Sequence, residues 1–148
     1  MKLTPHFSLD ELTRSDFALR NGIDNTPDQE TIDNLRDLCF NILEPLRSEI
    51  YQPITILSGY RSHTLNLAIG GVWTSQHVQG RAADFIVDGF DNLAIIHTMV
   101  QMKLKFDQLI NEFPPKGWVH VSYRKEGRGE VLEAYHEDGQ TKYRTLSA

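Results

Sequence analysis

The spacing of the apolar residues changes along this chain, and that change limits the folds it can adopt. In the segment 26–50, apolar side chains recur three to four positions apart, at Ile32, Leu35, Leu38, Ile42, Leu46 and Ile50. This spacing predicts a long amphipathic helix, and Pro45 predicts a kink or break within it. After Pro53 short strand patterns take over. Because helices gather early and strands late, the sequence favours an α+β fold over a doubly wound α/β sheet.

Local signals divide the chain further. Segment 8–11 (SLDE) matches a capping box for a short helix, and segment 26–29 (TPDQ) predicts the start of the long helix, with Thr26 as the N-cap. We expect strands over 54–58, 82–87, 106–111 and 118–123, helices over 62–68 and 93–104, and a hairpin turning at Asp138-Gly139. Together these predict one domain over 1–148, with an N-terminal arm and short helices in 1–25 and a hairpin extension in 126–148.

Composition and charge exclude several classes of function. The chain has 148 residues and one cysteine, Cys39, so one core forms without disulfides. With 15 basic and 20 acidic residues and no basic block, the net charge of −5 argues against a nucleic-acid or membrane partner. The first 16 residues lack the apolar core of a secretory signal, and no apolar run is long enough to span a bilayer. We expect a monomer synthesised in the cytoplasm.

Three polar residues are candidate metal ligands. In SQHVQGRAADFIV (residues 75–87), His77 and Asp84 flank a glycine, and a turn there can bring both toward one ion. In WVHVS (residues 118–122), strand alternation separates His120 from the two valines, so it can face a cleft. Two imidazoles and one carboxylate leave one tetrahedral position of zinc open, as in catalytic sites. Spacing alone leaves two alternatives open. His77 and Asp84 can be an ordinary solvated pair, and His120 can be a half-buried strand histidine.

The order of the motifs resembles one known family. The patterns SxHxxGxAxD at 75–84 and WxH at 118–120 are similar to those of the zinc D-alanyl-D-alanine carboxypeptidases, a family that includes phage L-alanyl-D-glutamate endolysins. The upstream motif SGYRS (58–62), with Leu65-Asn66 and Gly70-Gly71, resembles the carboxypeptidase-like branch. The resemblance extends over residues 7–123. It implies a Hedgehog-like α+β fold in which a small antiparallel sheet, packed with N-terminal helices, carries the zinc site.

The resemblance also implies roles for individual residues. Carried over position by position, His77, Asp84 and His120 bind one Zn²⁺ ion. Arg61 binds a carboxylate of the substrate, a role that suits its planar fork of donors, and Ser75 lies near the scissile peptide or the polar groups of the substrate. The implied partner is a peptidoglycan stem peptide, cut either as a D-Ala-D-Ala carboxypeptidase or as an L-Ala-D-Glu endopeptidase in lysis or cell-wall remodelling. The enzyme would then act on the wall after release from the cytoplasm.

One departure from the family pattern concerns the general base. Many relatives carry a glutamate three residues before the last histidine, where this chain has Gly117. We expect Glu112, at the end of the preceding strand, to replace it, because a turn through 114–117 can return the chain beside His120. Asp107 is the second choice. The alternative is that Glu112 is an ordinary solvated carboxylate.

Two other classes of function stay open on the sequence. A zinc-binding but non-catalytic recognition module of Hedgehog-like fold would keep the three ligands and would not need Glu112. A metal-free cell-wall-binding domain would keep only the fold. Metal content and peptidoglycan hydrolysis distinguish the three functions.

Overall fold

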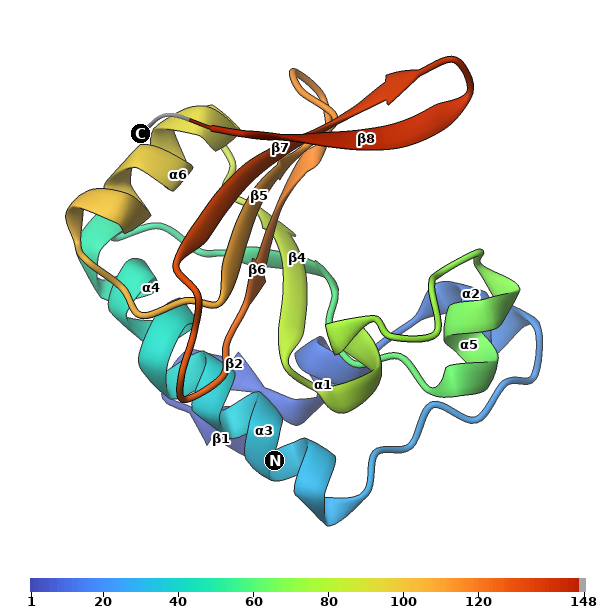
Figure 1. The fold of residues 1–148 in the computed structure, drawn as a ribbon. Coiled ribbons are helices and arrows are strands. Elements are labelled where there is room, and N and C mark those ends of the chain that lie inside the picture. Colours follow the sequence, from blue (N-terminus) through green and yellow to red (C-terminus); the bar gives the residue numbers. More distant parts are fainter. Residues whose placement is uncertain (147–148) are drawn as a thin grey trace.

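The structure is a computed structural model that describes residues 1–146 and combines helices with two sheets (Figure 1). The larger sheet has six strands in the order β3-β4-β6-β5-β7-β8. Their bounds are β3 Thr55–Ser58, β4 Ala82–Ile86, β5 Gln108–Glu112, β6 Trp118–Ser122, β7 Glu130–Glu137 and β8 Gln140–Thr145. The smaller sheet pairs β1 (Lys2–Thr4) with β2 (Phe7–Ser8). The predicted α+β class is confirmed.

The helices are short, apart from one long helical segment in the first half of the chain. They are α1 Leu9–Thr13, α2 Asp16–Arg20, α3 Gln29–Leu38, α4 Glu44–Ile50, α5 His63–Ala68 and α6 Asn92–Gln101. A π-helical turn, η1 (Cys39–Leu43), joins α3 to α4, and a short 3₁₀ turn, η2 (Gln76–Gln79), precedes β4. The capping box predicted at Ser8 is formed at the start of α1.

The long helix predicted over 26–50 differs in two details. Its N-cap is Asp28, whose carboxylate accepts the Thr31 N–H at 2.9 Å, so the prediction of Thr26 as the cap was wrong. At the predicted break, the chain widens into η1, where the Glu44 N–H bonds to the Cys39 carbonyl five residues earlier. An α-turn at this point would press the ring of Pro45 against a carbonyl four residues before it, and the wider turn relieves that clash.

The larger sheet is mixed, so the expectation of a small antiparallel sheet was incomplete. Strands β3, β4, β6 and β5 are antiparallel neighbours, but β7 pairs with β5 in parallel. Strand β6 has β4 on one side and β5 on the other, so β7 cannot pair with it. Strand β7 pairs with β5 instead, and because it runs opposite to β6 it is parallel to β5. The predicted hairpin is confirmed, with Asp138 and Gly139 at φ 52° and 72°, as a type I′ turn requires.

The two faces of the larger sheet differ in character. Inward-facing residues of β4, β5 and β6 join the core with α3, η1, α4 and α6, through Ala83, Phe85, Leu109, Val119 and Val121. These helices lie on one side of the sheet in Figure 1, and the tip of the β7–β8 hairpin extends toward the other side. Strand alternation places Asp84, Glu112 and His120 on the face away from the core.

Candidate active site

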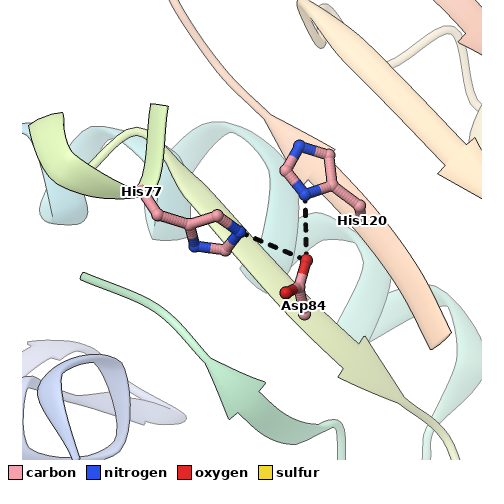
Figure 2. A group of neighbouring side chains, drawn as sticks. All are labelled: His77, Asp84 and His120. Atoms are coloured by element: carbon pink, nitrogen blue, oxygen red, sulfur yellow. Dashed lines mark hydrogen bonds and ion pairs between the residues drawn. The ribbon is translucent and has the colours of Figure 1, made fainter. Parts of the chain in front are cut away.

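The structure brings together the three predicted metal ligands (Figure 2). Asp84 on β4 and His120 on β6 are directly opposite each other in the antiparallel ladder, with His120 Nδ1 2.9 Å from Asp84 Oδ1. His77 in η2 reaches the same oxygen with Nε2 at 3.3 Å. One donor atom from each residue lies within 4.8 Å of the other two, so a single ion can contact all three.

Local capping fixes the position of His77. The hydroxyl of Ser75 accepts the backbone N–H of His77 at 3.2 Å and begins η2. The turn ends at Gly80 with φ of 72°, a conformation that glycine adopts without strain. A Cβ on Gly80 would lie 2.7 Å from Cγ2 of Thr31, because the turn packs closely against α3. The motif SxHxxG is therefore a compact turn that delivers one histidine to the sheet.

The hydrogen bonds of His77 determine which of its nitrogens is free for a metal. Its Nδ1 lies 2.7 Å from the Gly59 carbonyl, an acceptor, so Nδ1 carries the proton. Burial lowers the pKa of His77 and keeps its ring neutral, which leaves a lone pair on Nε2. Burial alone would raise the pKa of Asp84, but the adjacent histidines hold it well below its usual range. A lone pair and a carboxylate oxygen at 3.3 Å repel each other unless a cation lies between them. The donor set fits a divalent ion such as zinc.

Glu112 lies on the same face as the three ligands. In the β5–β6 ladder Ile110 is opposite His120, and Glu112 is opposite Trp118. Glu112 is therefore a diagonal neighbour of His120, and the two Cβ atoms are roughly 7 Å apart. Burial raises the pKa of Glu112 and the charge of Asp84 adds to this, while His120 and Arg61 oppose it. A half-buried carboxylate with a raised pKa is suited to act as a proton acceptor.

The turn between β5 and β6 explains why position 117 carries glycine. A Cβ at Gly117 would lie 1.6 Å from the carbonyl oxygen of Glu112, so no side chain fits there without moving the backbone. A glutamate at this position, as the family resemblance leads one to expect, is sterically excluded from this turn. Glu112, from the adjacent strand, instead presents a carboxylate beside the three ligands.

Arg61 is attached through its backbone to η2, the turn that contains His77. Its N–H donates to the His77 carbonyl at 3.0 Å. Burial lowers the pKa of its guanidinium, although the charges of Asp84 and Glu112 oppose the shift, and an arginine stays charged in proteins. The Nε of Arg61 is buried without a hydrogen-bond partner within residues 1–146. Because an unpaired buried donor is costly, this atom indicates a place for an acceptor from a ligand.

The comparison with protein families agrees with this geometry. The model of the family Peptidase M15 matches residues 5–122, most of the chain. The chain belongs to the Peptidase M15 family. Peptidases of this family are zinc-dependent, in accord with the cluster of two histidines and one aspartate. No curated protein matches the chain. None of the helices within residues 1–146 is long and apolar enough to cross a membrane.

The predicted metal ligands of this M15 domain lie in a cleft of about 800 Å³. Its floor is the polar face of β4, β6 and β5, and one side is the loop over 69–76 that leads into η2. The opposite side comes from the C-terminal hairpin, which lies beyond the residues matched by the family. The hairpin residues in the cleft, which the sequence reasoning missed, are Leu132, Thr141 and Tyr143.

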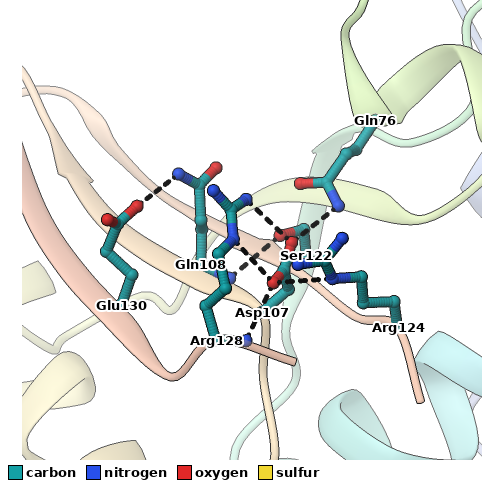
Figure 3. A network of polar contacts seen from close by, with 7 residues as sticks. All are labelled: Gln76, Asp107, Gln108, Ser122, Arg124, Arg128 and Glu130. Carbon is teal, nitrogen blue, oxygen red and sulfur yellow. Dashed lines mark hydrogen bonds and ion pairs between the residues drawn. The ribbon is translucent and has the colours of Figure 1, made fainter. Parts of the chain in front are cut away.

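Asp107, the second candidate base, has a structural role in this M15 domain (Figure 3). Its side chain is fully buried and accepts hydrogen bonds from Arg124, Arg128 and Gln76 at 2.9–3.1 Å. The hydrogen bonds from Arg128 are the main reason that its pKa lies well below the usual range. With its oxygens engaged, Asp107 is unsuited to accept a proton from water. Asp107 instead connects Gln76, the residue before His77, to Arg128 in the loop before β7.

Proposed function

We propose that this M15 domain is a zinc-dependent peptidase that hydrolyses a peptide bond beside a carboxylate in peptidoglycan stem peptides. The observation that carries the proposal is the presence, in one cleft, of a metal-binding cluster, a carboxylate with a raised pKa and a cation with an unpaired donor. These are the three groups that peptide hydrolysis next to a carboxylate requires. The cell-wall substrate is inferred from the family resemblance.

The residues divide the chemical work between them. His77, Asp84 and His120 would hold one zinc ion, and their combined charge leaves the bound ion with one net positive charge. When bound, zinc supplies Lewis acidity, polarises the scissile carbonyl and lowers the pKa of water to about 7. Glu112 accepts a proton from the attacking water and returns it to the leaving amine. Its raised pKa brings it closer to neutral pH, where such a transfer is efficient.

Arg61 would bind the carboxylate of the substrate with its planar fork of donors. In D-Ala-D-Ala this carboxylate belongs to the terminal residue, on the leaving side of the scissile bond. In L-Ala-D-Glu the free carboxylate of D-Glu is also on the leaving side. Arg61 therefore supports both bonds equally. Ser75 lines the same cleft and contributes a polar contact near the scissile peptide.

Mass analysis of reaction products tests the proposal. The zinc-loaded protein is incubated with a defined stem pentapeptide and with purified peptidoglycan, in parallel with a chelated sample and one to which zinc is restored. We expect hydrolysis that the chelator abolishes and zinc restores, with loss of one alanine for the carboxypeptidase or cleavage after L-Ala for the endopeptidase.

Two results would contradict the proposal. A protein that binds one equivalent of zinc but cleaves neither substrate would be a non-catalytic zinc-binding module. A protein with intact ligands that retains less than about half an equivalent of zinc would be a metal-free domain.

A further inference from the structure

The C-terminal hairpin occupies the opposite end of the sheet from the segment that carries Arg61. Arg61 follows β3, the metal ligands lie on β4, β6 and η2, and β7 and β8 come last in the strand order. In the strand order the metal cluster therefore lies between the segment that carries Arg61 and the hairpin. A peptide with its carboxylate on Arg61 and its scissile carbonyl at the cluster must direct its amino-terminal part toward the hairpin.

Strand register places hairpin side chains on the same face as the metal ligands. Across the sheet, Glu112 is opposite Ala134, and Ala134 is opposite Tyr143. Two residues before Glu112 on β5, Ile110 is opposite His120 on β6 and opposite Leu132 on β7. Residues that are directly opposite on neighbouring strands share a face. Two adjacent rows of side chains therefore extend from the cluster onto the hairpin.

The ring of Tyr143 can contact a ligand in the cleft. It lies beyond the small, fully buried Ala134, lines the same cleft as Glu112, and is 55% exposed. Burial raises the pKa of Tyr143, and the negative charge of Glu112 adds to the shift. With Leu132 and Thr141 beside it, Tyr143 forms an uncharged surface of aromatic, aliphatic and hydroxyl groups.

The hairpin is braced against the rest of the domain. The N–H of Phe113, just after β5, donates to the Ala134 carbonyl at 2.9 Å. The ring of Phe113 stacks on that of His136, with centroids 4.2 Å apart. At the start of β7, Arg128 is bound to the buried Asp107. Because these contacts fix the hairpin at both ends before a substrate binds, its side chains are preorganised and can select among substrates.

We propose that the β7–β8 hairpin is the far wall of the substrate groove, and that Tyr143, with Leu132, binds the part of the peptide on the amino-terminal side of the scissile bond. This inference rests on the proposed peptidase function. From β6 to β8 there are three strand spacings, roughly 14 Å. An extended peptide of about four residues spans that distance. Tyr143 is therefore a specificity-determining residue for substrate length.

A ladder of peptides with a common carboxyl-terminal end tests the inference. The value of kcat/KM is measured for peptides of two to five residues, using wild type and Tyr143→Ala. We expect wild type to gain about tenfold from the shortest to the longest peptide, and Tyr143→Ala to lose that gain. If the bond cut is L-Ala-D-Glu, the ladder is replaced by the tripeptide with and without its muramic acid.

Tyr135→Ala is the matched control. Tyr135 is in the same hairpin on the opposite face, under the guanidinium of Arg144 at 4.4 Å, and we expect it to retain the length dependence of wild type. A second readout is fluorescence anisotropy of the zinc-loaded proteins with the pentapeptide, labelled on its lysine side chain. Tyr143→Ala should bind about tenfold more weakly than Tyr135→Ala.

The outcomes distinguish this inference from the proposed function. If the peptides are cleaved and Tyr143→Ala keeps the full length dependence, the hairpin wall is overturned and the peptidase stands. If no peptide is cleaved but Tyr143→Ala binds more weakly than Tyr135→Ala, the wall stands and the peptidase is overturned. Equal binding by both variants in that case overturns both.

Discussion

Replacement of Glu112 by glutamine tests the residue on which the chemistry depends most. Glutamine keeps the size and hydrogen-bonding capacity of the side chain but cannot accept a proton at neutral pH. The substitution should leave the backbone unchanged. Glu112 is at the end of β5, and its backbone carbonyl, not its side chain, packs against Gly117. The substitution therefore isolates the protonation chemistry from the shape of the cleft.

The expected magnitude follows from the role of a general base. Loss of such a group lowers the rate by about 10² to 10⁴, which corresponds to about 2.7 to 5.5 kcal/mol of transition-state stabilisation. We expect this loss in kcat. The value of KM should change little, because Arg61 and the metal cluster still bind the substrate.

The pH dependence provides a second signature of the same residue. Glu112 must be ionised to accept a proton, so kcat/KM of wild type falls as pH decreases through its pKa. Burial and the charge of Asp84 raise that pKa. The acid limb should therefore lie above the ordinary value of 4.5. In Glu112→Gln this limb should disappear.

The assay is steady-state hydrolysis of the stem peptide by proteins of equal zinc content. Glu130→Gln is the matched control, since Glu130 is on the adjacent strand β7 and its carboxylate is bound by Gln108. It should retain activity within about twofold, because Glu130 does not line the cleft. If Glu112→Gln keeps more than about a tenth of the wild-type kcat with the acid limb intact, Glu112 is not the base.

Three further predictions concern the metal, the substrate and the stability of the fold. Asp84→Asn removes the anionic ligand and should weaken zinc binding more than about a hundredfold, since loss of supporting groups alone costs 10- to 100-fold; titration against a chelating dye measures it. Arg61→Lys should raise KM by about ten- to a hundredfold for substrates with the carboxylate, and leave KM unchanged for the corresponding amides. Asp107→Asn should lower the free energy of unfolding by about 3 kcal/mol at neutral pH. Because the folded-state pKa of Asp107 is depressed, this stability is present above its ordinary pKa of 3.8 and is lost as pH falls toward the folded-state value; urea unfolding at neutral and acidic pH should show the difference shrink.

Local patterns in the sequence predicted many of the elements, because their causes are local. The capping box at Ser8, the hairpin turn at Asp138 and the alternation around His120 depend on neighbouring residues, and each is present in the structure. The N-cap was wrong because Thr26 and Asp28 both have side chains that can cap. The sequence pattern does not distinguish them, and the structure uses Asp28.

The position of β7 in the sheet could not be predicted from the sequence. Alternation along a strand indicates which side chains share a face, but it does not indicate which strand lies alongside. That choice depends on which edges of the sheet remain free after β4 has paired with β6. The hairpin side of the cleft, including Tyr143, was missed for this reason.

The chemistry of individual residues was therefore determined by the sequence, and their combination by tertiary structure. The ligand types, the turn at Gly80 and the face of His120 follow from residue identity and short spacing. The pairing of Asp84 with His120, and the diagonal placement of Glu112, follow from strand register. The burial of Asp107 against Arg128 also joins residues far apart in the chain. Register and burial are set by how the whole sheet packs on the helices, and such non-local contacts leave no mark in a local sequence pattern.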